Sequence, residues 1–445
     1  MRVLFSNPPW WSKCDNIVLK DGNTDIQCYG GVRAGSRWPF TFLHRSIPDR
    51  YIFGDYTPYP FFMGYAATYV ARYTNANVIF RDSIALKESY KTFFNYLKQE
   101  KFDFIVIESS TPSFETDIKI INRIKKILPF TKIILTGTIA NCNEDLIQKY
   151  GLYAVINGEY EKGVVRVING ESGIIEQDLL SIEEMNNSPY PYYDSSIAYR
   201  YWDVNPKGQI FPQAQVWSSR GCPFKCIFCV WPAVMTGNDA DGSGKRFVRQ
   251  YSADYMEGFL SELVERYGFR SIYFDDDTFN LGDKHVVKMC EVMERIGLPW
   301  SAMCRTDTIS LDTWKIMKEA GCFGVKIGFE SGNQYVVNKI VNKNLDLTYS
   351  EKVVHHLKKI GMKVHGTFTY GLPGETIEQM ADTKAFIARL PFDSVQQSGC
   401  AEIEGTPLHT LSKTGSLKNY EGAVIDSTYT REKDGAVKMK KLKDS

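Results

Sequence analysis

The sequence predicts an α/β protein built from two consecutive βα regions. Residues 1–160 alternate short apolar runs with amphipathic helical runs, which is typical of a doubly wound, Rossmann-like parallel sheet. Residues 211–410 resume this alternation in larger units with six strand-like runs, which indicates a partial (βα)6 barrel of the TIM type. Three closely spaced cysteines directly follow the first strand-like run of that second region.

In the first region, the expected strands are 3–6, 77–80, 104–109, 132–135 and 153–156. Helical runs such as 87–97 and 115–128 lie between them. Residues 161–210 lose the alternation and contain a proline-punctuated stretch, so we predict a linker there. Residues 411–445 are expected to form a C-terminal tail with a basic, solvated end.

In the second region, the expected strands are 213–218, 271–274, 300–304, 325–329, 363–370 and 395–400. The helical runs between them include 253–267, 284–296 and 350–360. In a barrel of this kind the active residues lie at the carboxyl ends of the strands. The cysteine loop would follow the first of these strands.

Composition excludes several classes of protein. The chain of 445 residues is 43% hydrophobic and 24% charged, which is ordinary for a globular protein. Its net charge of +1 argues against nucleic acid as a main partner. No apolar run approaches the length of a membrane span, and the ten unevenly spaced cysteines indicate a reducing compartment. We therefore expect a cytoplasmic protein without a membrane span.

The cysteines Cys222, Cys226 and Cys229 form a C-x3-C-x2-C array. Thiolates suit soft metals and iron–sulfur clusters, and spacings this short let three of them converge on one centre. A zinc site needs a fourth ligand close by, and the nearest candidates downstream are His285 and Cys290. Three ligands with an open fourth position indicate a [4Fe-4S] cluster, while zinc and plain buried cysteines stay open as alternatives.

This array, with the aromatic Phe228 before its last cysteine, resembles the cluster loop of the radical S-adenosylmethionine (SAM) superfamily. The resemblance implies that the three cysteines hold a [4Fe-4S] cluster whose fourth iron is chelated by SAM, with Phe228 at the cofactor. One electron then cleaves SAM to a 5′-deoxyadenosyl radical, which abstracts a hydrogen atom from a small-molecule substrate. It also implies an external electron donor such as flavodoxin or ferredoxin.

Four polar stretches lie at the ends of the second to fifth expected strands of the second region and resemble elements that contact SAM or substrate in the same superfamily. The residues that this resemblance implies are Asp276, Asp277, Gly328, Glu330 and Ser331. Arg305 and Tyr370 lie at strand ends of the same region and are expected to face the site. Arg305 is expected to pair with the carboxylate of SAM. A solvated acidic turn stays open for Asp276 and Asp277, and a packed interior for Tyr370.

The first region resembles the cobalamin-binding domain of the B12-type subfamily, through the turns at 7–9, 136–138 and 157–159. The implied cobalamin contacts are Asn7, Pro8, Ser109, Thr111, Gly137, Thr138 and Gly158. The chain has no Asp-x-His-x-x-Gly after its first strand, so no histidine is placed as a lower cobalt ligand. The resemblance then implies cobalamin with its base displaced, and an empty scaffold is the alternative.

A connection of roughly 50 residues leaves the first strand, which is far longer than usual. It carries Arg37 and Trp38, and we expect Trp38 or Arg37 to cover the lower face of cobalt or to close the substrate pocket. A packed surface loop is the other interpretation.

The resemblance as a whole implies a cobalamin-dependent radical SAM methyltransferase. Its substrate would be an unactivated carbon, or phosphorus, of a small natural-product or lipid precursor. The alternative is a radical SAM dehydratase, cyclase or rearrangement enzyme whose N-terminal domain is empty or structural.

Overall fold

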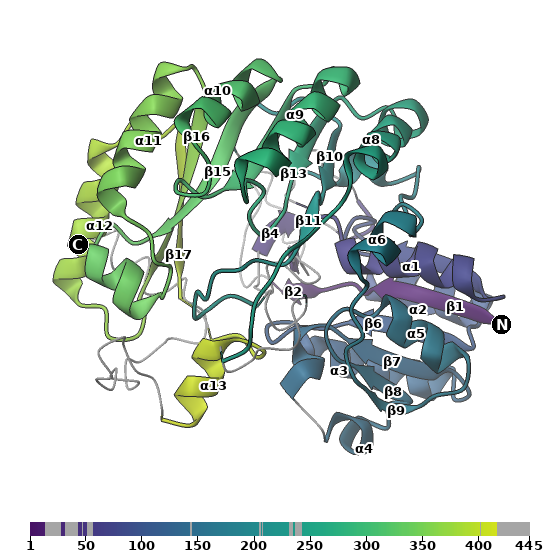
Figure 1. Ribbon diagram of the computed structural model, residues 1–445. Coiled ribbons are helices and arrows are strands. Elements are labelled where there is room, and N and C mark those ends of the chain that lie inside the picture. The colour runs from purple at the N-terminus through teal and green to yellow at the C-terminus, as the bar shows by residue number, and fades with distance from the viewer. Residues whose placement is uncertain are drawn as a thin grey trace, which may run out of the picture. The chain divides into compact units, whose positions relative to one another are not determined.

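The structure is a computed structural model that describes residues 1–13, 28–31, 43–46, 48–50, 57–142, 145–203, 206, 208–230, 235, 243–400 and 402–415 (Figure 1). Two compact units make up the chain. The first is Met1–Asp203 with Ala233–Asn238, and the second is Val204–Pro232 with Asp239–Ser445. Within the described ranges, no helix combines the length and the apolar composition that crossing a membrane requires.

The first unit contains a six-stranded, fully parallel sheet. Its order is β5-β1-β6-β7-β8-β9. The strands are β1 (Arg2–Asn7), β5 (Asn77–Asp82), β6 (Phe104–Glu108), β7 (Lys132–Thr136), β8 (Ala154–Ile156) and β9 (Gly173–Ile175). The expected strands of this region are thus confirmed, and the Rossmann-like class with them.

Helices cover both faces of this sheet. On one face, α2 (Tyr90–Glu100) and α3 (Phe114–Ile127) bury Phe93, Leu97 and Ile121 against Leu4 and its neighbours on β6 and β7. On the other face, α1 (Phe61–Tyr73) contacts β1, β5 and α5 (Glu161–Ile168). Successive side chains of a strand point to opposite faces of the sheet. Because helices cover both faces, side chains on both must be apolar, and this explains why the strands are continuously apolar.

Helix α2 begins three residues later than the sequence predicts. Lys87 has a left-handed backbone with φ 55°, which a helix cannot continue through. Ser89 then caps the helix, since its side chain accepts a hydrogen bond from the backbone N–H of Thr92 at 3.1 Å.

The first unit extends beyond residue 160, where the sequence predicts that its first domain ends. Helix α5 and strand β9 follow, and Val155 of β8 pairs with Ile174 of β9. Short strands carry little periodicity, and β9 has only three residues, so the pattern cannot be read from the sequence. Helices α4 (Leu146–Tyr150) and α6 (Ile182–Asn187) and the short helices η1 (Thr138–Cys142) and η2 (Ala198–Arg200) complete the unit.

The long connection after β1 contains strands that the sequence does not predict. They are β2 (Trp11–Lys13), β3 (Cys28–Gly31) and β4 (Leu43–Ser46), which form an antiparallel three-stranded sheet. Trp38 and Arg37 lie outside the described residues, and so does the tail from residue 416. The expected roles of Trp38 therefore stay predictions.

The second unit contains a second parallel sheet, with strands in sequential order β10-β13-β14-β15-β16-β17. The strands are β10 (Gln213–Val216), β13 (Ser271–Phe274), β14 (Trp300–Cys304), β15 (Cys322–Glu330), β16 (Lys363–Tyr370) and β17 (Ser394–Gly399). The first and last of these strands do not pair with each other, so the sheet is an open, partial barrel. This confirms the (βα)6 prediction.

Helices connect these strands and lie along the outer side of the sheet in Figure 1. They are α8 (Ala253–Tyr267), α9 (Asp283–Ile296), α10 (Leu311–Glu319), α11 (Leu347–Lys359) and α12 (Ile377–Arg389). Aromatic rings fill the space beneath them. Phe329 of β15 stacks on Phe368 of β16 at 5.6 Å between ring centroids, and Phe386 of α12 lies 5.7 Å from Phe329.

Three further elements lie at the carboxyl ends of the strands. A small antiparallel pair, β11 (Ser219–Arg220) and β12 (Arg249–Gln250), follows β10. The π-helical turn η3 (Val336–Ile340) follows β15, and α13 (Pro407–Lys413) follows β17. These elements surround the cysteine loop.

Candidate active site

The cysteine loop begins after β11, at the carboxyl end of β10, as the sequence predicts. Its middle is fixed by two backbone hydrogen bonds: Ile227 donates to the carbonyl of Val341 at 2.9 Å, and Leu408 donates to the carbonyl of Ile227 at 2.7 Å. Ile227 is buried in an apolar cluster that includes Val336 and Leu372, and Phe228 packs against the same cluster. The middle of the loop is therefore anchored through its apolar residues.

Cys222, Cys226 and Cys229 form no disulfide and are partly exposed. Desolvation, and then the negative charge of Asp277, raises the pKa of the Cys222 thiol to about 11. Its sulfur lies 3.7 Å from the hydroxyl of Thr278. A thiol that binds a metal must be deprotonated, and this environment disfavours the thiolate. The positive charge of a bound metal would stabilise the thiolate.

Among the described residues, no three His, Cys, Asp or Glu side chains are arranged to hold one metal ion. A [4Fe-4S] cluster asks for something different, because each cysteine binds its own iron atom and the sulfurs stand apart. Three partly exposed thiols on one loop are the donor set that such a cluster needs. The residues present fit the cluster.

Asp276 is fully buried and holds the entrance of the cysteine loop. Its carboxylate accepts hydrogen bonds from the backbone N–H of Ser218 at 3.1 Å, from the hydroxyl of Ser218 at 2.8 Å and from that of Ser219 at 2.6 Å. His285 Nε2 lies 3.0 Å from the same Ser218 hydroxyl. The end of β13 is thereby tied to the residues that lead from β10 into the loop.

His285 makes the stability contributed by this hydrogen-bond network depend on pH. Burial, and then Lys288, lowers the pKa of His285 from 6.5 to about 4. In the unfolded chain His285 is protonated below pH 6.5, whereas in the folded chain it stays neutral until about pH 4. Neutral His285 therefore contributes its full stability above pH 6.5, and this contribution is lost as the pH falls toward 4.

We expect the free energy of unfolding of the wild-type chain to fall by about 2 kcal/mol between pH 7 and pH 5 relative to His285→Gln, which does not titrate. Urea unfolding of both proteins at the two pH values measures this difference. Equal losses in the two proteins would contradict it.

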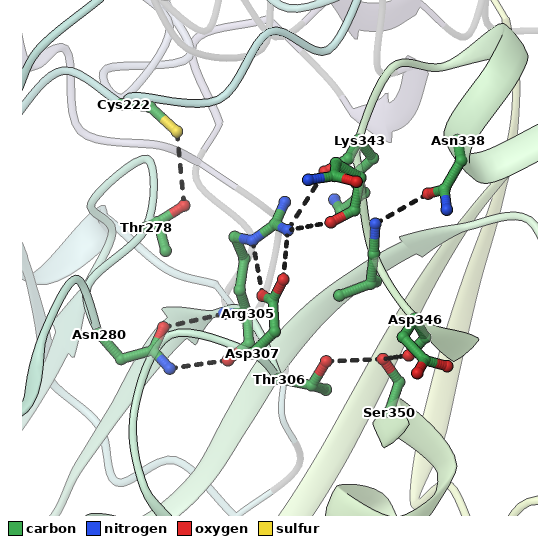
Figure 2. A network of polar contacts seen from close by, with 12 residues as sticks. Cys222, Thr278, Asn280, Arg305, Thr306, Asp307, Asn338, Lys343, Asp346 and Ser350 are labelled. Carbon is green, nitrogen blue, oxygen red and sulfur yellow. Dashed lines mark hydrogen bonds and ion pairs between the residues drawn. The ribbon is translucent and has the colours of Figure 1, made fainter. Parts of the chain in front are cut away.

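Arg305 is buried at the end of β14 and has partners on three sides (Figure 2). Its guanidinium binds both carboxylate oxygens of Asp307, at 2.9 and 2.8 Å, and donates to the carbonyl of Lys343 at 3.2 Å. It also stacks on the ring of Phe224, 3.5 Å from the ring centroid. Arg305 thus connects β14 to the cysteine loop and to the turn after η3.

Glu330 and Lys343 form a nearly buried ion pair at 2.9 Å, with 12% and 9% of their side chains exposed. The other carboxylate oxygen of Glu330 accepts a hydrogen bond from Thr369 at 3.1 Å. Gly328 makes room for the pair, because a Cβ there would lie 2.5 Å from the Glu330 carboxylate and 2.9 Å from the Lys343 ammonium. Burial alone would lower the pKa of Lys343, but Glu330 and then Cys226 raise it above its usual value.

The remaining predicted residues are placed as follows. Ser331 is buried, with its hydroxyl 2.8 Å from that of Thr383 on α12. The Tyr370 hydroxyl donates to Gln397 at 3.0 Å, and burial, then Glu375, raises its pKa to about 12. Direct contacts of these residues with SAM or substrate stay predictions.

Lys343 is the residue of this site that sequence reasoning missed. It lies between two asparagines with left-handed backbones, Asn342 at φ 60° and Asn344 at φ 51°. Asparagine tolerates this conformation better than most residues, so the run Asn-Lys-Asn is a weak signal for a sharp turn. Its pairing with Glu330 could not be read from the sequence.

A cavity of about 530 Å³ opens beside the cysteine loop. Its lining residues come from that loop and from the segment around η3: Pro223, Phe224, Lys225, Asn338, Lys339, Asn342, Lys343 and Asn344. Three of them are lysines and three are asparagines, and none is a carboxylate.

The carboxyl edge of the first unit's sheet carries the residues expected to contact cobalamin. Some are already engaged: Asn7 donates to Asp82 at 2.8 Å, and the Ser109 hydroxyl donates to Asp117 at 2.6 Å. Pro8 is buried beside Asn7, and Thr111 is half-buried. These residues shape the edge whether or not they contact a ligand.

Other groups at this edge are buried without a hydrogen-bond partner among the described residues, namely Ser6 Oγ, Thr138 Oγ1 and Asn157 Oδ1, the last of these next to Gly158. Such groups are costly unless a bound molecule satisfies them. Gly137 has φ +92°, and a Cβ there would lie 2.3 Å from the carbonyl oxygen of Ser109. Only glycine therefore fits at this position, and no side chain covers the backbone there. A large ligand with many polar groups fits this edge.

The comparisons with known proteins agree with this geometry. Residues 218–387 match the family model of the Radical SAM superfamily. They contain the cysteine loop, Asp276, Arg305 and Glu330. This segment of the chain therefore has the sequence of a radical SAM domain.

Two curated relatives are methyltransferases by name. An uncharacterized methyltransferase, PH0819, of Pyrococcus horikoshii is 30% identical over 59% of this chain and 55% of its own length. Cytidylyl-2-hydroxyethylphosphonate methyltransferase of Streptomyces wedmorensis is 25% identical over 54% of this chain and 45% of its own. The chain thus spans about half the length of these relatives.

Solved structures share the fold across both units. The radical SAM methyltransferase TsrM of Kitasatospora setae, solved with tryptophan and a SAM analogue, aligns with a TM-score of 0.62 at 15% identity over 82% of this chain and 79% of that chain. The cobalamin-dependent SAM radical enzyme OxsB aligns with a TM-score of 0.59 at 14% identity over 86% of this chain and 58% of that chain. The chain therefore shares its fold with these two structures.

Proposed function

We propose that this protein is a radical SAM methyltransferase that uses a [4Fe-4S] cluster, SAM and cobalamin. The observation that carries the proposal is the C-x3-C-x2-C loop at the carboxyl end of β10, inside a domain that matches the radical SAM superfamily. The buried polar groups at the carboxyl edge of the first unit's sheet support cobalamin as the third cofactor. The methyltransferase names of the relatives favour methylation over dehydration, cyclisation or rearrangement.

In this proposal Cys222, Cys226 and Cys229 hold the cluster, and the first unit holds cobalamin through the edge that includes Thr138. When bound, the cluster supplies the electron that cleaves SAM, and cobalamin carries the methyl group that is transferred. The protein supplies position, charge and exclusion of water.

We assign Asp276 the role of positioning the cysteine loop, because Ser218 and Ser219 already occupy its carboxylate. Arg305 does the same for Phe224. The Glu330–Lys343 pair places opposite charges at the end of β15. When SAM binds, Glu330 would pair with its amino group and Lys343 with its carboxylate. Asp277 and Tyr370 are proposed to face the substrate.

The substrate in this proposal is a small molecule methylated at an unactivated carbon or at phosphorus. The superfamily chemistry needs an external one-electron donor, for which a flavodoxin or ferredoxin is suitable. We place the reaction in the cytoplasm, because a reducing compartment keeps the ten thiols of the chain reduced.

The test is anaerobic purification with cluster reconstitution and added hydroxocobalamin, followed by measurement of iron, sulfide and bound cobalt. We expect about four irons and about one cobalt per chain. Thr138→Val removes a buried hydroxyl that has no hydrogen-bond partner among the described residues, so it should lower bound cobalt about tenfold without reducing the free energy of unfolding.

Cobalt in the wild type but equally in Thr138→Val would remove that edge from the cobalamin site. Iron without cobalt would keep the radical chemistry and contradict cobalamin-dependent methylation. S-adenosylhomocysteine formed together with 5′-deoxyadenosine would identify methyl transfer once a substrate is found. A chain that holds no iron after reconstitution would overturn the proposal.

A further inference from the structure

We propose that Thr278 is a positioning residue that raises the reduction potential of the cluster by donating a hydrogen bond to the sulfur of Cys222. The inference rests on the proposed function, because it requires a [4Fe-4S] cluster bound through that cysteine. The hydroxyl oxygen of Thr278 lies 3.7 Å from the sulfur of Cys222, a distance at which the two can share a hydrogen bond (Figure 2). Hydrogen bonds to the sulfurs are among the features that set the potential of an iron–sulfur cluster.

The hydroxyl of Thr278 is held in place by its neighbours in the chain. Thr278 is 4% exposed and lies in the bend that follows β13. The next residue, Phe279, is fully buried, and its backbone N–H donates to the carbonyl of Met303 at 2.8 Å. The ring of Phe279 lies 5.5 Å from that of Trp300. The bend is therefore fixed against β14.

The same bend also holds the chain that leads to the sulfur. Asp276, two residues before Thr278, accepts hydrogen bonds from the hydroxyls of Ser218 and Ser219 at 2.8 and 2.6 Å. Cys222 follows Ser219 three positions later. One short segment thus fixes both the entrance of the cysteine loop and the hydroxyl beside its first cysteine.

The direction of this hydrogen bond follows from the available protons. The hydroxyl of Thr278 carries one proton, which it donates to the carbonyl oxygen of Asp277 at 2.8 Å. While Cys222 is a thiol, its S–H proton can make the contact with the hydroxyl oxygen. A sulfur that binds iron has lost this proton, so only the hydroxyl can then donate. A hydroxyl rotates about its C–O bond, so it can turn from the carbonyl to the sulfur while the backbone stays in place.

The sign of the effect follows from charge. Reduction adds one electron to the cluster and makes its sulfur ligands more negative, so a hydrogen bond to the sulfur of Cys222 strengthens on reduction. The reduced form is thereby favoured. Asp277 acts on the same sulfur in the opposite direction, since its negative charge disfavours a thiolate there. Thr278 partly offsets this charge, and its proton stays on the hydroxyl oxygen throughout.

The experiment uses the full chain with its cluster reconstituted, and it measures the reduction potential without SAM by a dithionite titration followed by EPR. Thr278→Val replaces the hydroxyl by a methyl group of similar size. We expect the equilibrium constant for its reduction to fall about tenfold, which lowers the potential of a one-electron couple by about 59 mV. Thr278→Ser keeps the hydroxyl, so its constant should stay within about twofold of the wild-type value.

The matched control is Thr306→Val. Thr306 is also fully buried beyond a strand end, but its hydroxyl lies 2.7 Å from that of Ser350. This variant should keep the reduction constant within about twofold of the wild-type value. A second measurement observes the hydrogen bond directly. ENDOR spectra of the reduced cluster in H2O and D2O should show an exchangeable proton in the wild type and in Thr278→Ser that Thr278→Val lacks.

Several results would overturn the inference. An unchanged or higher potential in Thr278→Val would show that the hydroxyl does not favour reduction. An equal fall in Thr278→Ser would assign the effect to packing of the methyl group, and an equal fall in Thr306→Val would show that it is not local. If Thr278→Val holds no iron, Thr278→Ala carries the same prediction. Loss of iron there too would make Thr278 necessary for holding the cluster, which contradicts an effect on its potential alone. Failure of the proposed function is seen separately, as absence of iron in the wild type.

Discussion

Replacing Cys226 with serine should reduce bound iron from about four atoms per chain to below one and lower turnover at least 1,000-fold, while the chain stays folded. The thiol is partly exposed and packs only at the edge of the apolar cluster around Ile227, so serine should cost the fold about 1 kcal/mol or less. The loss arises because a hydroxyl is a poor ligand for iron, and two cysteines leave a second iron of the cluster without a protein ligand.

Cys400→Ser is the matched control for this prediction. Cys400 is 7% exposed and belongs to the same apolar cluster, but it lies outside the cysteine array. Iron content should therefore stay at about four atoms in Cys400→Ser. Iron, sulfide and zinc analysis of both variants after anaerobic reconstitution decides the matter. Retention of iron in Cys226→Ser, or one zinc per wild-type chain, would contradict the cluster assignment.

Replacing Lys343 with methionine should lower the free energy of unfolding by about 3–5 kcal/mol, because it leaves the Glu330 carboxylate nearly buried without its cation. Thr369 remains as a donor to that carboxylate, but a neutral hydrogen bond does not replace an ion pair. Urea unfolding of the cluster-free chain measures the loss separately from any effect on the cofactors.

The double variant Glu330→Gln/Lys343→Met tests the cause. Removing both charges should cost at least 1 kcal/mol less than the sum of the two single losses. Lys315→Met is the control, since Lys315 pairs with Asp312 at 3.4 Å on an exposed helix surface, where the side chains are 52% and 88% exposed. That change should cost less than about 1 kcal/mol. Additive losses at Glu330 and Lys343 would show that the pair is not coupled.

The alternation of apolar and amphipathic runs was sufficient to predict both sheets, because a parallel strand covered on two faces must be continuously apolar. Elements with little periodicity escaped prediction. Strand β9 has three residues, and β2, β3 and β4 have three or four residues each. Such short strands are stable only through the partners that tertiary structure brings to them.

By itself, the sequence determined the cluster loop, since the spacing of Cys222, Cys226 and Cys229 is local and needs no folding to be read. It also placed Asp276, Arg305 and Glu330 at strand ends. Only the tertiary structure decided what those side chains touch. Asp276 reaches Ser218, which is 58 residues away in the chain, and Glu330 meets Lys343 across a turn with left-handed residues. Such contacts depend on strand order and turn geometry, and a one-dimensional pattern carries neither.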